Sequence, residues 1–285
     1  MEQHYILKEA KSFEPVHVFE CGQCFRWTKE KDESYTGVIK NSVINVKKIG
    51  NDIHFSGICE GNIQTICEEY FNLQTNYEEI KEKLSNIDEF LKNSIEYGKG
   101  IRILKQDLWE TLLSFIISAN NNIPRIKIII ERIAQKYGNK TEFKNKIYYT
   151  FPTPEMLQNA SVEDFRSLGL GFRDVRIYET VQKTLKGEIN LEELKQEQNT
   201  EILREHLLKI PGVGPKVADC VLLFALNKFD VFPVDVWVKR VISELYFSNK
   251  EQTPKVIHEF AEKQYGNLAG LAQQYLFYWR RENEL

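Results

Sequence analysis

Residues 207–240, LLKIPGVGPKVADCVLLFALNKFDVFPVDVWVKR, shape the interpretation of the whole chain. Residues 200–208 are expected to form a helix and PGVG a tight hairpin, with Pro215 in the first turn of a second helix, where its missing N–H is harmless. Gly212 and Gly214 allow positive φ and a close approach to a ligand, and the free N–H groups of the new helix favour an anion. This unit suits a nucleic-acid phosphate, although PGVG is also an ordinary turn between helices.

Lys216 lies in the first turn of that second helix. The residues that follow, 217–226, are apolar on almost every side, which is typical of a buried helix. We therefore expect a buried lysine near the positive end of the helix dipole, where the neutral amine is favoured. A neutral lysine is a nucleophile that can form a Schiff base at a sugar carbon. The alternative is a lysine whose stem lines the core while its ammonium group reaches water.

Asp235 stands directly before another helix with apolar periodicity. It is expected to cap that helix, a contribution of roughly 1 kcal/mol. A carboxylate held by helix N–H groups stays ionised and can also stabilise positive charge that develops on a sugar. Capping and catalysis are therefore compatible roles for this residue.

These residues resemble the helix-hairpin-helix DNA glycosylase superfamily. KVADC and PVDV resemble more specifically its 8-oxoguanine DNA glycosylases of the eukaryotic type. Further matches follow the family's order along nearly the whole chain: GQCFRW at 22–27, YFNL at 70–73, RILKQD at 102–107, SFIISANNNIPRI at 114–126, LGLGFR at 168–173 and AGLAQQYLF at 269–277. Several separated matches are far more specific than one glycine-rich hairpin, which polymerases and ligases also use.

The fold class expected is α+β. Residues 35–58 are rich in β-branched residues, and Gly50, Asn51 and Asp52 mark a hairpin turn, which predicts an antiparallel sheet. From about residue 63, and almost everywhere beyond Asp88, the pattern is helical. Expected helices include a buried one at 107–119 and an amphipathic one at 124–137 that Gly138 ends, with later ones beginning near Ser161, Asp174, Leu191, Thr200, Pro215, Val236, Thr253 and Leu268. The resemblance implies a twisted sheet domain with flanking helices at 1–90, packed on a mostly helical helix-hairpin-helix glycosylase domain at 91–285.

Composition limits the interpretation without contradicting it. The net charge of −3 and pI near 6.1 show no overall basic footprint, so a basic face for DNA has to be local. Residues that could form it are Arg125, Lys127, Arg132, Arg173, Arg176, Lys239 and Arg240. Without a transmembrane run or a signal peptide, we expect an intracellular protein with no membrane partner, acting as a monomer.

The cysteines argue against metal cofactors. There are five, an odd number that suits a reducing compartment. Cys21 and Cys24 form a C-x-x-C pair, but Cys59 and Cys67 are poorly spaced for a second zinc pair. No cysteine follows Cys220, so the C-terminal four-cysteine iron–sulfur cluster of several superfamily relatives cannot form here. No organic cofactor is expected.

The resemblance also implies the chemistry and the lesion pocket. Lys216 attacks C1′ of the damaged nucleotide, and Asp235 stabilises the oxocarbenium-like transition state. The carbonyl of Gly22 accepts the N7–H that 8-oxoguanine has and guanine lacks. Cys220 and Phe277 sandwich the flipped base, while Gln273 reads its pairing edge. Alternatives from the sequence alone are a turn at Gly22, core positions for Cys220 and Phe277, and a surface position for Gln273.

Residues for contact with DNA follow from the same resemblance. Asn120, Arg125 and Arg173 contact the cytosine left without its partner, Asn121 fills the gap in the stack, and Gly212, Gly214 and Val217 approach the backbone, although asparagines are also ordinary turn residues. Phe172 occupies the position of a tyrosine wedge, keeping the ring and losing the hydroxyl. Trp237 is a clearer departure from the family pattern, because the family has a histidine near the DNA backbone at this position. Backbone carbonyls of Leu208, Ile210 and Val213 are implied ligands of a monovalent cation.

The function expected is a bifunctional glycosylase and abasic-site lyase acting on 8-oxoguanine in double-stranded DNA, preferably opposite cytosine. The target base would be flipped into the pocket. Two alternatives remain at this point. One is a glycosylase of the same superfamily for another lesion, against which Gly22, Gln273 and Phe277 argue. The other is a non-catalytic binder of damaged DNA, against which the joint presence of Lys216 and Asp235 argues.

Overall fold

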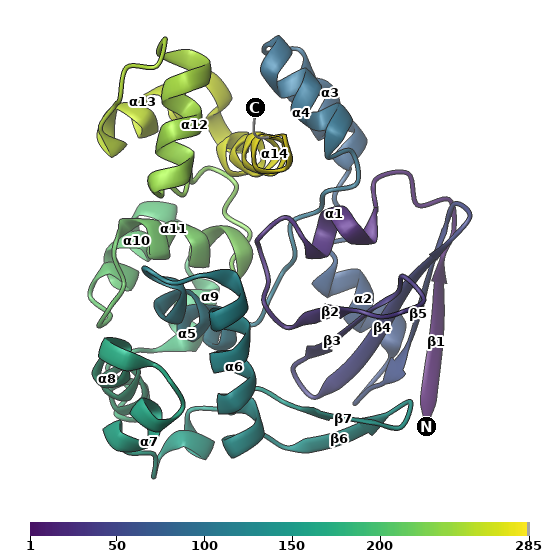
Figure 1. Cartoon of the computed structure of the whole chain (residues 1–285), viewed down its shortest axis with the longest axis vertical. Helices are drawn as coiled ribbons and strands as arrows, with labels where there is room; N and C mark the ends of the chain where they lie inside the picture. The colour runs from purple at the N-terminus through teal and green to yellow at the C-terminus, as the bar shows by residue number, and fades with distance from the viewer. Residues whose placement is uncertain (284–285) are drawn as a thin grey trace.

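An N-terminal antiparallel sheet is followed by a larger helical region in this computed structural model, which describes residues 1–283 (Figure 1). The sheet has five strands in the order β1-β5-β4-β3-β2. The strands are β1 (Glu2–Leu7), β2 (Trp27–Lys29), β3 (Tyr35–Ile39), β4 (Ser42–Ile49) and β5 (Asp52–Ile58). Ile49 pairs with Asp52 across the turn, and Gly50 has φ +61°, so the predicted hairpin is confirmed. The α+β class is confirmed with it.

The helical elements begin close to where the sequence predicts them. The helices are α1 (Pro15–Phe19), α2 (Ile63–Tyr70), α3 (Tyr77–Ser85), α4 (Glu89–Tyr97), α5 (Leu108–Ser118), α6 (Ile123–Tyr137), α7 (Val162–Ser167), α8 (Asp174–Leu185), α9 (Leu191–Gln196), α10 (Thr200–Leu208), α11 (Pro215–Phe224), α12 (Val236–Tyr246), α13 (Pro254–Tyr265) and α14 (Ala269–Glu282). Side-chain N-caps explain most of these boundaries, such as Asp107 before α5 and the Ser161 capping box before α7. No helix within residues 1–283 is long and apolar enough to cross a bilayer.

A second, two-stranded sheet corrects the prediction that nearly everything beyond Asp88 is helical. Strands β6 (Lys140–Phe143) and β7 (Lys146–Tyr149) form a hairpin after α6. Its turn residues Lys144 and Asn145 have φ of 48° and 59°, as a two-residue hairpin turn of this kind requires. Such short strands lack a recognisable alternation, and their position depends on the surface beneath them.

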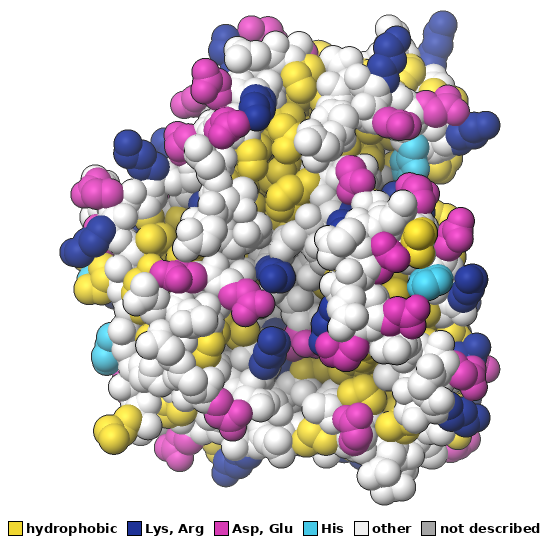
Figure 2. Space-filling model, turned by 180° about the vertical axis from the view of Figure 1, so that it is seen from behind, with side chains coloured by type: hydrophobic (Ala, Val, Ile, Leu, Met, Phe, Trp, Pro, Cys, Tyr) yellow, Lys and Arg dark blue, Asp and Glu magenta, His cyan; other side chains and the backbone are white. Residues whose placement is uncertain are grey.

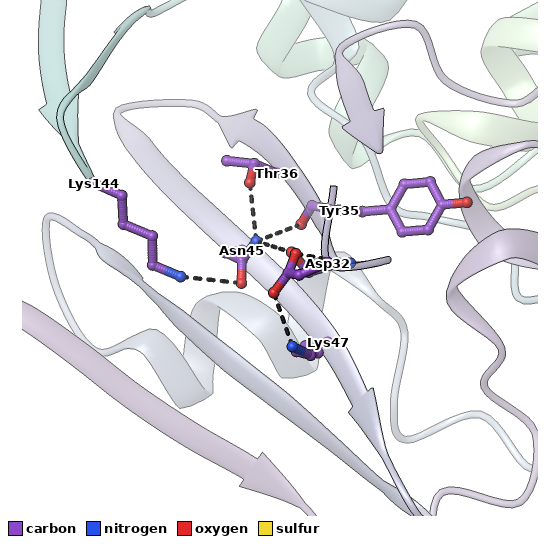
Figure 3. Close-up of polar contacts among 7 residues, drawn as sticks. Asp32, Tyr35, Thr36, Asn45, Lys47 and Lys144 are labelled. Atoms are coloured by element: carbon purple, nitrogen blue, oxygen red, sulfur yellow. Dashed lines mark hydrogen bonds and ion pairs between the residues drawn. The ribbon is translucent and has the colours of Figure 1, made fainter. Parts of the chain in front are cut away.

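That surface is the outer face of the N-terminal sheet. Phe143 and Tyr148 of the hairpin pack there against Val38 and Val43, whereas α1 and α2 cover the opposite face. Figure 3 shows the polar part of the contact, in which Lys144 Nζ donates to Asn45 Oδ1 at 3.3 Å. The hairpin thereby fastens the helical region to the sheet.

The helical core extends around α5 and α11, whose side chains are buried almost throughout. Leu84 of α3 and Leu91 of α4 belong to this core, and α4 packs along α14. The domain boundary near residue 90 stays a prediction. The segment around Gly22 joins the two cores, since Cys21 and Phe25 pack with the helices and Cys24 packs with the sheet.

Candidate functional site

The hairpin between α10 and α11 uses its two glycines differently. Gly212 has φ +82°, and a Cβ there would lie 2.8 Å from Arg176 Cδ. Gly214 has φ −99° and ψ 179°, an extended conformation open to any residue, so the expectation of positive φ at Gly214 was wrong. A Cβ on Gly214 would meet no atom within 4 Å. What this glycine provides is open space beside the uncapped N–H groups of α11, the environment that suits a phosphate.

Lys216 is half-buried, which corrects the expectation of a buried lysine. Its side chain leaves the first turn of α11 toward α5, and Nζ lies 5.2 Å from the centre of the Phe115 ring. The helix beyond it is buried as predicted. The ammonium group therefore has a low-dielectric neighbour on one side and access to solvent on the other.

Cys220 lies one helical turn beyond Lys216 and is 3% exposed. Burial raises the pKa of its thiol to about 11, the positive charge of Lys216 opposes that rise, and the carboxylates of Asp219 and Asp235 add to it. The thiol is thus neutral at physiological pH and acts as an apolar wall. Both Lys216 and Asp235 therefore lie close enough to Cys220 for their charges to act on its thiol.

Asp235 caps α12 as predicted. Its carboxylate accepts the N–H of Val238 at 2.8 Å and remains half-buried. Such a cap holds the carboxylate in one orientation and leaves its other lone pairs free. The residue can therefore stabilise a nearby positive charge without losing its structural role.

Three of the predicted pocket residues come together across the domain junction. Gly22 has φ +88°, and a Cβ there would lie 3.3 Å from Phe277 Cε1 of α14. Gln273, one turn before Phe277, is 6% exposed, so the surface position considered for it is wrong. Gln273 and Phe277 border one small hollow with Val238 of α12. Gly22 lies against Phe277, and Phe277 in turn borders this hollow.

An aromatic chain links this pocket to the lysine. The rings of Phe25 and Phe115 meet edge to face with centroids 5.4 Å apart, and Phe115 in turn lies beneath Lys216. The segment that carries Gly22 and the helix that carries Lys216 therefore pack on the same side chain of α5.

The three asparagines in the loop between α5 and α6 (the asparagine loop), at positions 120–122, make different contacts. Asn122 caps α6 by accepting the N–H of Arg125 at 3.0 Å, and Asn121 donates to the carbonyl of Ile117 at 3.2 Å. Asn120 is exposed with φ +53°. Structure alone therefore accounts for Asn122. Arg125 is exposed and donates to the carbonyl of Gly169 at 3.3 Å, and the contacts of Asn120 and Arg125 with DNA stay predictions.

Arg173 is 3% exposed, which the sequence did not indicate. Its guanidinium donates to the carbonyls of Asn120 at 2.8 Å and Leu170 at 3.3 Å, and it also holds Ala119. Here the side chain shapes the asparagine loop, and its contact with cytosine stays a prediction. The neighbouring Phe172 is 57% exposed, as expected of a wedge, with the guanidinium carbons of Arg173 and Arg176 at 4.2 and 5.4 Å from its ring centre.

The remaining predicted contacts are less defined. Trp237 is half-buried, and its Nε1 is a buried donor with no partner among residues 1–283. Val217 is 5% exposed, so it can reach DNA only through its backbone. The carbonyl of Ile210 accepts the N–H of Val213 at 3.1 Å and keeps a second lone pair, which is compatible with the implied cation. Both the cation and these contacts stay predictions.

The molecule also carries a face of mixed charge and a separate cavity. Figure 2 shows acidic and basic side chains intermixed over one face, so no field of a single sign exists there. A cavity of about 660 Å³ opens near the C-terminal end of α11, lined by Lys105, Asp107 and Leu226 among others, and none of the predicted site residues borders it. Functional interest therefore stays with the junction around Gly22, Lys216 and Phe277.

The sequence did not predict a role for some residues that lie at the site. Phe115 and Gln274 lie within motifs that resemble the family but have no predicted role, and Arg281 lies outside those motifs. The spacing 274, 277 and 281 places three side chains on one face of α14, and that spacing was the available signal. Its meaning depends on the segment that lies against this face.

Comparison with known proteins agrees with this geometry. Residues 5–112 match the N-terminal domain of 8-oxoguanine DNA glycosylase, and residues 113–266 match the HhH-GPD superfamily of base excision DNA repair proteins. The N-glycosylase/DNA lyase of Saccharomyces cerevisiae is 34% identical over 259 residues, which cover 81% of this chain and 68% of the yeast protein. The probable N-glycosylase/DNA lyase of Methanothermobacter thermautotrophicus is 34% identical over 218 residues, covering 70% of this chain and 69% of that protein.

A solved structure is similar over the full length. It is the Clostridium acetobutylicum 8-oxoguanine glycosylase/lyase in complex with double-stranded DNA containing cytosine opposite 8-oxoguanine. The two folds superpose with a TM-score of 0.94 and 44% identity, covering 100% of this chain and 99% of the other.

Proposed function

This chain belongs to the 8-oxoguanine DNA glycosylases of the helix-hairpin-helix base-excision repair superfamily, and from that premise we propose how its residues divide the work. The enzyme is an 8-oxoguanine DNA glycosylase with abasic-site lyase activity, and its partner is double-stranded DNA that contains the lesion. The assignment of roles to individual residues is the proposal.

Lys216 is the nucleophile. The flipped nucleotide presents C1′ to the amine, the glycosidic bond breaks, and the base leaves with the bonding electrons and takes up a proton. The resulting Schiff base permits β-elimination of the 3′ phosphate. The partly exposed position of Lys216 leaves a path by which the DNA sugar can reach Nζ.

Asp235 stabilises the positive charge that develops on the sugar during base departure. The Val238 N–H fixes the carboxylate at the start of α12, so little reorganisation is needed in the transition state. The thiol of Cys220, buried beside both charges, excludes water from the same place.

Lesion recognition is assigned to the junction between the domains. The Gly22 carbonyl accepts the N7–H of 8-oxoguanine, Phe277 and Cys220 stack on the base, and Gln273 pairs with its edge. The observation that carries the proposal is the close approach of Gly22 to Phe277, where an added Cβ would lie 3.3 Å from the ring, because it brings the loop before β2 against α14. Asn120, Arg125 and Arg173 are assigned to the opposite cytosine.

Covalent trapping tests the assignment of Lys216. Borohydride should reduce a Schiff base between the wild-type enzyme and a duplex that carries 8-oxoguanine opposite cytosine, and Lys216→Gln should abolish the adduct while duplex binding persists. Lys209→Gln is a matched control, because it removes an exposed lysine from the end of the preceding helix. Undiminished adduct with Lys216→Gln would assign the nucleophile to another residue.

A further inference from the structure

Side chains fix the backbone on both sides of Gly22. The carbonyl of Cys21 accepts a hydrogen bond from Gln274 Nε2 at 2.5 Å, and the carbonyl of Gln23 accepts one from Gln106 Nε2 at 2.8 Å. One residue earlier, the carbonyl of Glu20 accepts from Arg281 at 2.5 Å. The peptide before Gly22 and the peptide after Gln23 are therefore held in direction as well as in position, and the peptide that carries the Gly22 carbonyl lies between them.

The Gly22 carbonyl itself accepts no hydrogen bond from residues 1–283. It is an available acceptor between two pinned neighbours. Glycine with φ +88° has the most rotational freedom of any residue type, so without its neighbours this carbonyl would sample many directions. Its direction is set by Gln23 and by what holds Cys21.

Gln274 is placed to set that direction relative to the pocket. It lies on the same face of α14 as Phe277 and Arg281, and this face lies along the segment that contains Gly22. Gln273, which we assign to the base, directly precedes it in the chain. One helix thus carries both the stacking group and the donor that fixes the opposing segment.

We propose that Gln274 is a positioning residue for lesion recognition, holding the Gly22 carbonyl at the correct place relative to Phe277 and Gln273. This inference rests on the function proposed above for Gly22. Gln274 is 2% exposed and acts through the Cys21 peptide rather than through the substrate. It therefore governs how well the enzyme selects the lesion, not the lysine chemistry.

The physical reason is that a single acceptor discriminates only if it is held in place. Misplacement of a reacting or reading group by about 1 Å can cost about 100-fold in rate. A buried amide donor at 2.5 Å restrains the Cys21 carbonyl, and the restraint passes to Gly22 through one planar peptide. Loss of the donor frees that peptide to rotate.

Gln274→Met tests the idea, because methionine has nearly the same shape and no donor. We expect single-turnover excision of 8-oxoguanine opposite cytosine to fall at least about tenfold. Cleavage of a duplex with a preformed abasic site, which has no base to read, should change less than about twofold, since Lys216 and Asp235 are untouched. Tyr275→Phe is the matched control, because the neighbouring buried hydroxyl has no partner among residues 1–283, and both activities should persist.

Each outcome is decisive. Unchanged excision by Gln274→Met overturns the proposal. An equal loss of excision and of abasic-site cleavage also overturns it, because such a loss indicates general damage to the fold. If Gln274→Met does not fold, Gln274→Asn replaces it, because its amide is one methylene too short to reach Cys21 and the same split is expected. Failure of the proposed function is seen separately, as wild-type enzyme that excises no 8-oxoguanine.

Discussion

Gly22→Ala tests the lesion pocket most directly. Gly22 has φ +88°, and the added Cβ would lie 3.3 Å from Phe277 Cε1. The left-handed backbone costs a residue with a Cβ roughly 1–2 kcal/mol. The contact with Phe277 is tighter than ordinary packing, so the ring has to move by a few tenths of an ångström or the carbonyl has to turn.

Either response disturbs recognition. We expect the free energy of unfolding to fall by about 1–2 kcal/mol and single-turnover excision of 8-oxoguanine opposite cytosine to fall at least tenfold, equivalent to about 1.4 kcal/mol of barrier. Excision is measured by strand cleavage of a labelled duplex, with saturating enzyme and at a temperature far below the melting point. Cleavage of a preformed abasic site should stay near the wild-type rate.

Gly187→Ala separates backbone strain from the pocket. Gly187 has φ +75°, and a Cβ there would meet no atom within 4 Å. The two variants share the backbone cost, and only one crowds Phe277. Wild-type excision by Gly22→Ala, or a similar loss of excision in both variants, would refute the reasoning.

Three further predictions concern the chemistry, the opposite base and pH. Asp235→Asn keeps much of the helix cap, so melting should stay nearly native while excision falls at least about tenfold; native single-turnover excision would make the carboxylate only structural. Lesions opposite cytosine should be excised faster than lesions opposite adenine, and Arg125→Ala should reduce the difference in activation free energy between the two by about 1–3 kcal/mol. Single-turnover excision from four duplexes that differ only at the opposite base measures this difference. Equal wild-type rates on all four duplexes would contradict the prediction. Burial raises the pKa of Glu110 to about 7 from its usual 4.5, with Arg26 opposing the rise. A carboxyl whose pKa is raised in the folded state contributes stability below pH 4.5, and this stability is lost as pH rises to about 7. In urea unfolding, Glu110→Gln should therefore become more stable relative to the wild type as pH rises from 5 to 8. A difference in the free energy of unfolding that stays constant over this pH range would contradict the prediction.

Local sequence signals predicted most of the elements correctly. The buried pattern of α5 and the amphipathic pattern of α6 gave both helices, and side-chain caps such as Asp107 and Ser161 marked where helices begin. The turn at Gly50 was equally clear. The β6–β7 hairpin was missed, because its short strands owe their place to Phe143 and Tyr148 packing on a distant sheet.

The amino-acid sequence by itself identified the family through its motifs, and it predicted the chemistry that we propose from a lysine after a glycine hairpin and an aspartate before a helix. These are local patterns, because caps, turns and helix starts depend on residues a few positions apart. Only the tertiary structure decided how exposed Lys216 is, that Arg173 is buried beneath the asparagine loop, and that Gln274 holds the peptide before Gly22. Long-range hydrogen bonds join residues up to 261 positions apart, and such contacts are set by how two hydrophobic cores pack together, which no local pattern records.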